Sequence, residues 1–223
     1  IFQQLEARAE DEDSEVHLSM FEVYNEELRD LLDPRKKKMD ISMDKVEGTV
    51  ISGLEKVAVH NEDEVAKAVQ SGQSNRAVTA TNMNEHSSRS HLILRLYLRL
   101  TNKTSGDVTF SKLSLVDLAG SERIAKSGAE GAALKEAQGI NKSLSALGNV
   151  VRSLASGQGH CPYRNSKLTH ALSDSIGGNA KTLMFCNISP REEDIPETLC
   201  SLQFAVQAKE VKSGPVKKQT KKA

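Results

Sequence analysis

Apolar and polar positions alternate most regularly over residues 92–100, where even-numbered leucines share one face, and this alternation predicts a strand. A turn over 102–107 then returns the chain as a second strand over 108–116, so the two form a hairpin. The stretch 16–24 is rich in β-branched and aromatic residues and predicts a further strand. A continuous apolar run over 182–188 predicts a buried strand.

Helical periodicity is clearest over 134–155, where apolar residues recur every three or four positions along one stripe. Shorter helices are predicted over 26–32, 163–175 and 196–209, the last opening on Pro196. A helix over 61–72 begins with a capping box, in which Asn61 is followed three residues later by Glu64, and ends at Gly72.

The segments between these elements are expected to be loops or short strands. Residues 10–15 form an acidic loop, 74–91 a polar loop and 121–133 a loop rich in glycine, alanine and serine. Residues 40–59 predict short strands broken at glycines, and 1–9 resemble the end of a helix. Strands that alternate with helices favour a layered α/β domain.

The composition changes this picture little. Hydrophobic residues make up 38% and charged residues 27% of the 223 positions, which is typical of a globular domain with a charged surface. No run of eighteen apolar residues is present, so no membrane span is predicted. The three cysteines fit no zinc-binding spacing and are expected to be small buried side chains.

Charge is unevenly distributed although the formal net charge is zero. Residues 1–40 hold twelve acidic and six basic side chains, whereas residues 203–223 hold six lysines and one glutamate. A basic tail favours an anionic partner, and a solvated end of the chain is the alternative interpretation.

The first candidate for chemistry is the end of the second hairpin strand, where Asp117 is followed three residues later by Gly120. A carboxylate at the end of a buried strand can hold Mg²⁺ directly or through water. The glycine leaves its N–H free to approach a terminal phosphate. The D-x-x-G pattern alone favours an ordinary turn, because Asp and Gly are common residues at strand ends.

The second candidate is the loop 84–91, which reads Asn-Glu-His-Ser-Ser-Arg-Ser-His. Ser87 and Ser88 can reach a phosphate oxygen or a water bound to Mg²⁺, and Arg89 suits a carboxylate. Glu122 is its natural partner, and such a latch would close a pocket only around a terminal phosphate. A serine-rich turn with an unrelated surface ion pair remains the alternative.

Several long motifs in a fixed order resemble the kinesin motor domain, and together they cover nearly all of residues 16–210. NEHSSRSH resembles the first switch loop of that family and LVDLAGSE the second. The other matching motifs are YNEELRDLL, TNMNE, INKSLSALGNV, CPYRNSKLT, KTLMFCNISP and ETLCSLQFA. The resemblance implies an incomplete P-loop NTPase-like layered fold, with a central sheet flanked by helices.

The resemblance implies an ATP-driven microtubule motor that uses Mg²⁺. By position, the implied nucleotide and magnesium residues are Asn84, Ser87, Ser88, Asp117 and Gly120. It further implies that Arg89 and Glu122 form the latch and place the attacking water. The helix over 134–155 would transmit the state of the switches to the track.

The implied microtubule contacts are Lys126, Tyr163, Arg164, Lys167 and His170. Tubulin has an acidic surface, so cations there would make binding sensitive to salt. His170 stands where many relatives are expected to carry arginine, which puts one track contact in doubt or makes it dependent on pH.

The chain after the last predicted helix resembles that of motors with a C-terminal head, which usually move toward the minus end. The implied partner is the microtubule, with no nucleic acid or membrane, in a cytoplasmic, cytoskeletal protein that a coiled coil elsewhere makes dimeric. The boundaries implied are a partial motor domain over 1–210 and a basic tail over 211–223.

No G-x-x-x-x-G-K-[ST] motif, the Walker A loop that cradles nucleotide phosphates, occurs in the sequence. Residues 177–182 are the nearest approach, but they lack the glycine before lysine and precede a predicted strand. The chain is therefore expected to be part of an ATPase motor that lacks its phosphate-binding loop. A nucleotide-free microtubule-binding module is the alternative. A nucleic-acid binder is a third and weaker interpretation, because the sequence has no recognition motif for nucleic acid.

Overall fold

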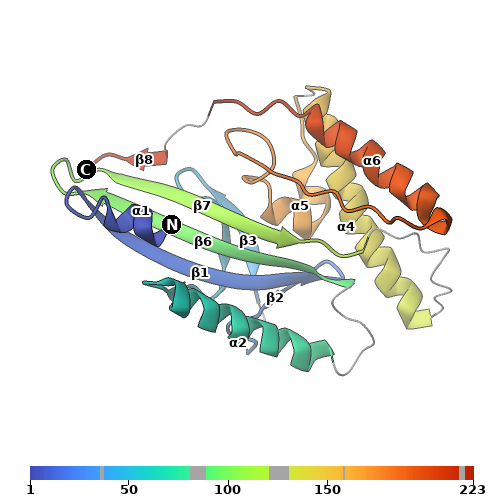
Figure 1. Ribbon diagram of the computed structural model, residues 1–223, viewed down its shortest axis with the longest axis horizontal. Helices are drawn as coiled ribbons and strands as arrows, with labels where there is room; N and C mark the ends of the chain where they lie inside the picture. The colour runs from blue at the N-terminus through green and yellow to red at the C-terminus, as the bar shows by residue number, and fades with distance from the viewer. Residues whose placement is uncertain (36–37, 81–88, 121–130, 158, 216–218) are drawn as a thin grey trace. The chain divides into compact units, whose positions relative to one another are not determined.

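The computed structural model describes all residues except 36–37, 81–88, 121–130, 158 and 216–218. The chain divides into two compact units (Figure 1). Unit 1 comprises Ile1–Ala119 with Lys217–Ala223, and unit 2 comprises Gly120–Val216.

Unit 1 is built on a sheet with the strand order β2-β1-β6-β7-β8, in which β5 also pairs with β1. All of these strand pairs are antiparallel. The strands are β1 (Glu12–Tyr24), β2 (Glu27–Asp30), β5 (Val57–Ala58), β6 (His91–Asn102), β7 (Val108–Asp117) and β8 (Gln219–Lys221). The long pairing of β1 with β6 and of β6 with β7 forms its centre.

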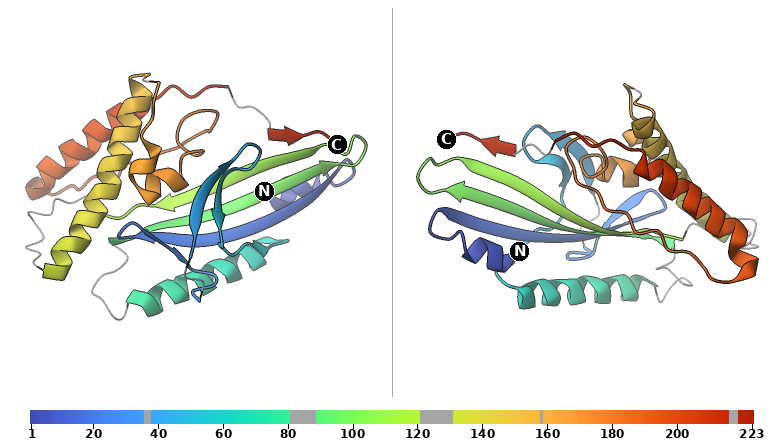
Figure 2. Two further views of the ribbon diagram at one scale, coloured as in Figure 1. Left: turned by 180° about the vertical axis from the view of Figure 1, so that it is seen from behind. Right: turned by 45° about the horizontal axis from the view of Figure 1, so that its top comes forward.

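The core of unit 1 lies where helix α2 (Glu62–Ala80) packs on the sheet, with the short helix α1 (Phe2–Glu6) beside it. Val16, Leu18 and Met20 alternate along β1 and are buried against α2, because successive strand residues face opposite sides. A separate hairpin of β3 (Asp40–Asp44) and β4 (Gly48–Ser52) crosses the sheet (Figure 2).

The regular elements among the described residues of unit 2 are all helices or 3-10 turns. The long helix α4 (Gly131–Ala155) runs beside α6 (Ile195–Lys209) (Figure 1). The short α5 (Lys167–Ala171) follows a 3-10 turn, η2 (Tyr163–Asn165), and a second turn, η3 (Glu192–Asp194), precedes α6. The helix α4 buries Leu147, Val150 and Val151, and α5 buries Leu168, so their apolar stripes form the core of this unit.

Most predicted elements are confirmed. The strands over 16–24, 92–100 and 108–116 form, as do the short strands within 40–59. The helices predicted over 134–155 and 196–209 agree with α4 and α6 to within a few residues. Apart from the short strands, the confirmed elements are those with the longest regular patterns in the sequence.

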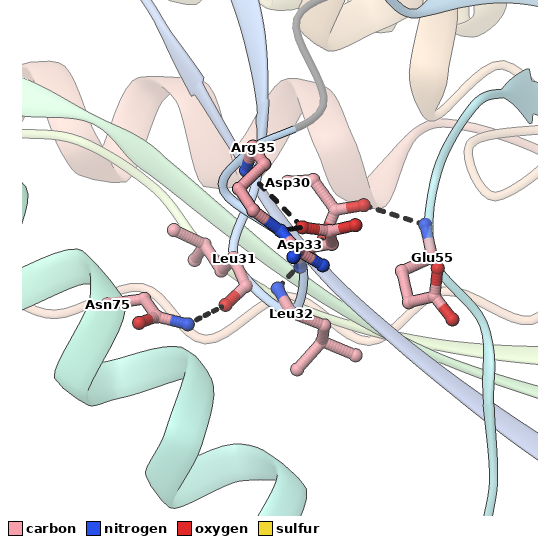
Figure 3. A network of polar contacts seen from close by, with 7 residues as sticks. All are labelled: Asp30, Leu31, Leu32, Asp33, Arg35, Glu55 and Asn75. Carbon is pink, nitrogen blue, oxygen red and sulfur yellow. Dashed lines mark hydrogen bonds and ion pairs between the residues drawn. The ribbon is translucent and has the colours of Figure 1, made fainter.

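The helix predicted over 26–32 is wrong, because this segment turns back as β2. Asn25 and Glu26 both have positive φ, at 49° and 62°, and form the two-residue turn of a tight hairpin with β1. The Asp30 carboxylate then accepts the N–H groups of Leu32 at 2.8 Å and Glu55 at 2.7 Å (Figure 3). Helical propensity yields here to pairing with the edge of β1.

The acidic loop predicted over 10–15 is also wrong from residue 12 onward, since β1 begins at Glu12. The acidic side chains are tolerated in a strand because cations from β6 and the turn after it neutralise them. Arg99 pairs with Glu15, and Lys103 lies 3.4 Å from Asp13.

The helix that begins after Asn61 continues past Gly72 to Ala80, so part of the predicted polar loop is helical. The cap by Asn61 is confirmed, because its side chain accepts the N–H of Glu64 at 2.9 Å, while the Glu64 carboxylate accepts the N–H of His60 at 2.8 Å. Gly72 does not end the helix. It allows close packing, since a Cβ there would lie 2.3 Å from the sulfur of Met20.

The buried strand predicted over 182–188 does not form. Leu183 and Phe185 are 78% and 81% exposed, and no described strand pairs with this segment. A strand needs a neighbour for its N–H and C=O groups, so an apolar run alone does not make one. Cys186 and Cys200 are exposed and Cys161 is half-buried, which corrects the expectation of buried cysteines.

The helix predicted over 163–175 is shorter than expected, since α5 spans only Lys167–Ala171. Ser166 caps it by accepting the N–H of Leu168 at 3.1 Å, and Tyr163–Asn165 form the 3-10 turn. The strand β8 in the basic tail was not predicted, and it pairs with the first residues of β7.

Candidate functional site

The sheet register brings together the two segments for which phosphate chemistry is predicted. The first residues of β6 pair with the last residues of β7, so that Leu92 lies opposite Asp117 and Ile93 opposite Val116. Arg89 is half-buried and stands three positions before Leu92. Segments 25 residues apart in the sequence therefore meet at one end of the sheet.

His91 is the first residue of β6, and its side chain connects this end of the sheet to the segment that follows β7. Its side chain is buried, and its Nδ1 accepts the N–H of Ala119 at 3.0 Å. Burial lowers the pKa of His91 from 6.5 to about 4, because the charged imidazolium would lose its hydration. The imidazole is thus neutral at physiological pH, and its proton resides on Nε2, because Nδ1 is the acceptor.

Ser90 precedes His91 and is held from helix α2. The guanidinium of Arg76 donates from Nη2 to the Ser90 carbonyl at 3.2 Å and to its hydroxyl at 3.0 Å. Ser90 is fully buried, so both of these hydrogen bonds are shielded from water. The backbone immediately after Arg89 is therefore fixed to a helix.

The same arginine reaches the carboxylate of Glu22, near the C-terminal end of β1. The Arg76 Nε lies 3.6 Å from one carboxylate oxygen, and Nη1 of Arg29 lies 3.5 Å from the other. The Glu22 side chain is 0% exposed, and a buried charge of this kind is stable only when it is compensated. A buried ion-pair network therefore connects β1, β2 and α2 to the start of β6.

The predicted nucleotide residues fall into two groups. Asp117 is exposed at the end of β7, where a carboxylate can meet a hydrated cation, and Gly120 is half-buried at the start of unit 2. The predicted residues that lie outside the described part of the chain are Asn84, Ser87, Ser88, Glu122 and Lys126. The latch between Arg89 and Glu122 therefore stays a prediction.

The predicted track residues that the structure describes occupy η2 and α5 in unit 2. Arg164 is exposed, while Tyr163, Lys167 and His170 are half-buried. The hydroxyl of Thr169 donates to the Tyr163 carbonyl at 2.6 Å, which closes the turn onto the helix. This short element therefore presents Arg164 to solvent from a backbone that is hydrogen-bonded to Thr169.

Tyr163 has a structural part in this turn. Its hydroxyl donates to the carbonyl of Ile176 at 2.6 Å. Burial, together with the nearby thiol of Cys161, raises the pKa of Tyr163 above its ordinary value, so the hydroxyl remains a proton donor.

Sequence reasoning missed Glu22, Arg76, Ser90 and His91 as parts of the site. A glutamate within the apolar stretch 16–24 was the available signal, because a charge in a buried strand implies a partner. The partner itself could not be predicted, since Arg76 lies 54 positions further along the chain.

No described helix combines the length and the apolar character that a membrane span needs. Within the same part of the chain, no three or more histidine, cysteine, aspartate or glutamate side chains gather as a metal site.

Comparison with known proteins shows which family and which proteins the chain is similar to. A model of the kinesin motor domain family matches residues 1–211. Kinesin-like protein KIN-14R of Arabidopsis thaliana is 49% identical over 221 residues, which is 98% of this chain and 20% of that protein. Kinesin-like protein 2 of Schizosaccharomyces pombe is 47% identical over 209 residues, which is 90% of this chain and 26% of that protein.

A solved structure shows the same fold. It is described as the structure of a fast kinesin, with implications for ATPase mechanism and interactions with microtubules. The superposition has a TM-score of 0.89 at 41% identity and covers 99% of this chain and 62% of that one. The chain thus spans about a fifth to a quarter of the curated relatives named here. On the family match and this shared fold, the chain belongs to the kinesin motor domain family.

Proposed function

We propose that this chain carries the phosphate-sensing and track-binding parts of an ATP-driven microtubule motor. The observation that supports the proposal best is the pairing of the start of β6 with the end of β7. It sets Arg89 and Asp117 at one end of the sheet, as a site that senses a terminal phosphate requires. The boundaries proposed are a partial motor domain over 1–210 and a basic tail over 211–223.

The nucleotide roles follow from the chemistry of each side chain. Asp117 would hold Mg²⁺ through its exposed carboxylate, together with the hydroxyls of Ser87 and Ser88, while Asn84 lies on the nucleotide side. The backbone N–H of Gly120 would meet the terminal phosphate. Bound ATP with Mg²⁺ supplies the phosphoryl group whose presence or loss these residues detect.

Arg89 and Glu122 would form the latch that closes only when the terminal phosphate is present. The guanidinium of Arg89 is a permanent cation, so it can pair with the ionised carboxylate of Glu122 wherever the loops bring the two together. Helix α4 begins nine residues after Glu122 and would carry the change toward the track.

The track face proposed is η2 and α5, with Arg164 and Lys167 as its main cations. Lys126, Tyr163 and His170 would complete it. Tubulin presents an acidic surface, so these cations would contribute attraction and orientation more than shape. Movement toward the minus end and dimerisation through a coiled coil outside this chain are further parts of the proposal.

A nucleotide-free microtubule-binding module is the second candidate. The sequence retains Ser88, Arg89, Asp117, Gly120 and Glu122, five residue types that nucleotide sensing needs and track binding does not. Their joint presence favours the motor over the module.

Cosedimentation of the purified chain with microtubules tests the track face. Arg164→Ala and Lys167→Ala are each expected to weaken binding by about threefold at low salt, as is typical of solvent-exposed charge pairs. Binding of the unmodified chain should also weaken as salt rises, because screening acts on exposed charges.

Arg35→Ala is the matched control, because the Arg35 side chain is 91% exposed and lies in unit 1, outside the proposed face. It should leave binding within about 1.5-fold of the unmodified chain. Equal binding by all three variants would place the track face elsewhere.

A further inference from the structure

We propose that His91 is a positioning residue that mounts the two phosphate-facing segments on one buried joint at the start of β6. This joint is the buried hydrogen-bonded cluster of Arg76, Ser90, His91 and the backbone of Ala119. This inference rests on the proposed function for the purpose of the segments, but the joint itself is a matter of geometry.

The first half of the joint is the hydrogen bond from the Ala119 N–H to Nδ1 of His91, at 3.0 Å. Ala119 lies two residues after the end of β7, where the strand ladder no longer holds the backbone. Ala119 is 5% exposed and His91 is 2% exposed, so water does not compete for this bond. The imidazole therefore fixes the backbone at Ala119, two residues after Asp117.

The second half of the joint is the pair of hydrogen bonds from Arg76 to Ser90. Two hydrogen bonds from one guanidinium reach the carbonyl and hydroxyl of Ser90, at 3.2 and 3.0 Å. Arg76 is itself oriented by the buried carboxylate of Glu22, 3.6 Å from its Nε. The backbone that follows Arg89 is thus held to α2 and β1 by charged groups that are preorganised before any ligand binds.

Ser90 and His91 are consecutive, so the hydrogen bonds from Arg76 and the hydrogen bond to Ala119 act on one short piece of backbone. A displacement of the backbone at Arg89 reaches Ala119 through a single side chain. Neutral imidazole is suited to this task because it accepts a backbone N–H and carries no charge that would need hydration. In the complete site, this joint would align the two segments before the latch between Arg89 and Glu122 closes.

Two substitutions at position 91 separate the hydrogen bond from the shape of the side chain. Leucine and asparagine have the same branching at Cγ, but only asparagine offers an oxygen near the position of Nδ1. His91→Leu therefore removes the acceptor, and His91→Asn keeps one. Amide exchange of the β6–β7 strand ladder serves as the folding control for both variants.

Amide hydrogen exchange of the purified chain is the first measurement. In His91→Leu, exchange at Ala119 should accelerate by about tenfold, as the loss of one buried hydrogen bond predicts, while the β6–β7 amides stay protected. In His91→Asn, exchange at Ala119 should stay within about threefold of the unmodified chain. Unchanged exchange at Ala119 in His91→Leu would overturn the joint.

Microtubule-stimulated ATP turnover of the full-length protein that carries this chain is the second measurement. His91→Leu should lower kcat by about tenfold and change KM for ATP by less than about twofold, because alignment acts after binding. His91→Asn should recover most of kcat. Equal loss of kcat in both variants would overturn the positioning role. Lack of turnover in the unmodified protein would refute the proposed function, while the exchange measurement would still decide the joint.

Discussion

The residues that organise this molecule at its candidate site are buried polar side chains that hold backbone groups. His91 accepts the N–H of Ala119, Arg76 holds Ser90, and Asp30 gathers three N–H groups. Each fixes a backbone segment that no strand ladder or helix reaches. Removing such a side chain leaves buried donors without partners, which costs more than the bond itself contributes.

The first prediction at this scale concerns pH. His91 has a pKa of about 4 in the folded chain and 6.5 when exposed, so below pH 6.5 the unfolded chain takes up a proton that the folded chain does not. The stabilising effect of the neutral imidazole is complete above pH 6.5 and is lost as pH falls toward 4, by up to about 3 kcal/mol. Urea denaturation between pH 7 and pH 5 measures the loss.

His91→Asn supplies the comparison, since asparagine does not titrate. From pH 7 to pH 5 the unmodified chain should lose about 2 kcal/mol more of its free energy of unfolding than His91→Asn loses. Parallel losses in the two proteins would show that His91 is not buried in its neutral form.

The second prediction concerns Asp30, which is 2% exposed and whose two carboxylate oxygens both accept backbone N–H groups (Figure 3). Asp30→Asn replaces one accepting oxygen by a donor, so that either the N–H of Glu55 or those of Leu32 and Asp33 lose their acceptor. The free energy of unfolding should fall by about 1–3 kcal/mol in chemical denaturation.

Asp13→Asn is the matched control for this change. The Asp13 side chain is 73% exposed and pairs with Lys103 at the surface, so its loss should cost less than about 0.5 kcal/mol. A similar cost for both substitutions would mean that the three backbone contacts of Asp30 contribute nothing to stability.

At the scale of elements, close packing decides where helices run and end. Gly72 lies inside α2 because the helix approaches β1 too closely there for a side chain. The segment after Tyr24 becomes a strand because the free edge of β1 accepts it. In both places the local sequence favours another outcome, and the neighbouring strand overrules it.

The prediction at this scale compares two helical glycines. Alanine normally stabilises a helix interior relative to glycine, by about 1 kcal/mol. Gly148→Ala in α4 should show this gain, because its Cβ would meet nothing within 4 Å. Gly72→Ala should instead destabilise by about 1–3 kcal/mol, because the buried Met20 would have to move.

Thermal or urea denaturation of the two variants checks the prediction, with the unmodified chain as reference. The opposite signs are the informative result, since both substitutions add the same methyl group to a helix. Stabilisation by Gly72→Ala would show that Met20 repacks at no cost.

At the scale of the whole molecule, two units carry the two proposed tasks. Unit 1 holds the strand end with Arg89, His91 and Asp117, and unit 2 holds the track residues on η2 and α5. The described residues of each unit bury a core of their own. A substitution in one core should therefore leave the local geometry of the other unit intact.

The prediction at this scale is that the purified 223 residues do not turn over ATP, with or without microtubules. The sequence contains no Walker A loop, and without one nothing is expected to cradle the α- and β-phosphates. A coupled phosphate-release assay measures turnover. Microtubule-stimulated release that Glu122→Ala abolishes would contradict this account.

The sequence by itself determined the class of fold, the longest elements and the family. Periodicity over 92–116 and 134–155 is strong because one face of each element is apolar over many residues. The motif that ends at Glu122 and the loop 84–91 identified where phosphate chemistry was to be expected, because each is a run of adjacent residue types suited to that task.

Only the tertiary structure decided which distant residues meet. The contact between His91 and Ala119, the network of Glu22 with Arg29 and Arg76, and the hairpin after Tyr24 depend on sheet register and burial. The exposed run over 182–188 shows the same rule in reverse, since an apolar pattern becomes a strand only where a neighbour pairs with it. Local patterns record what each segment can bury, whereas pairing and burial are properties of the assembled chain.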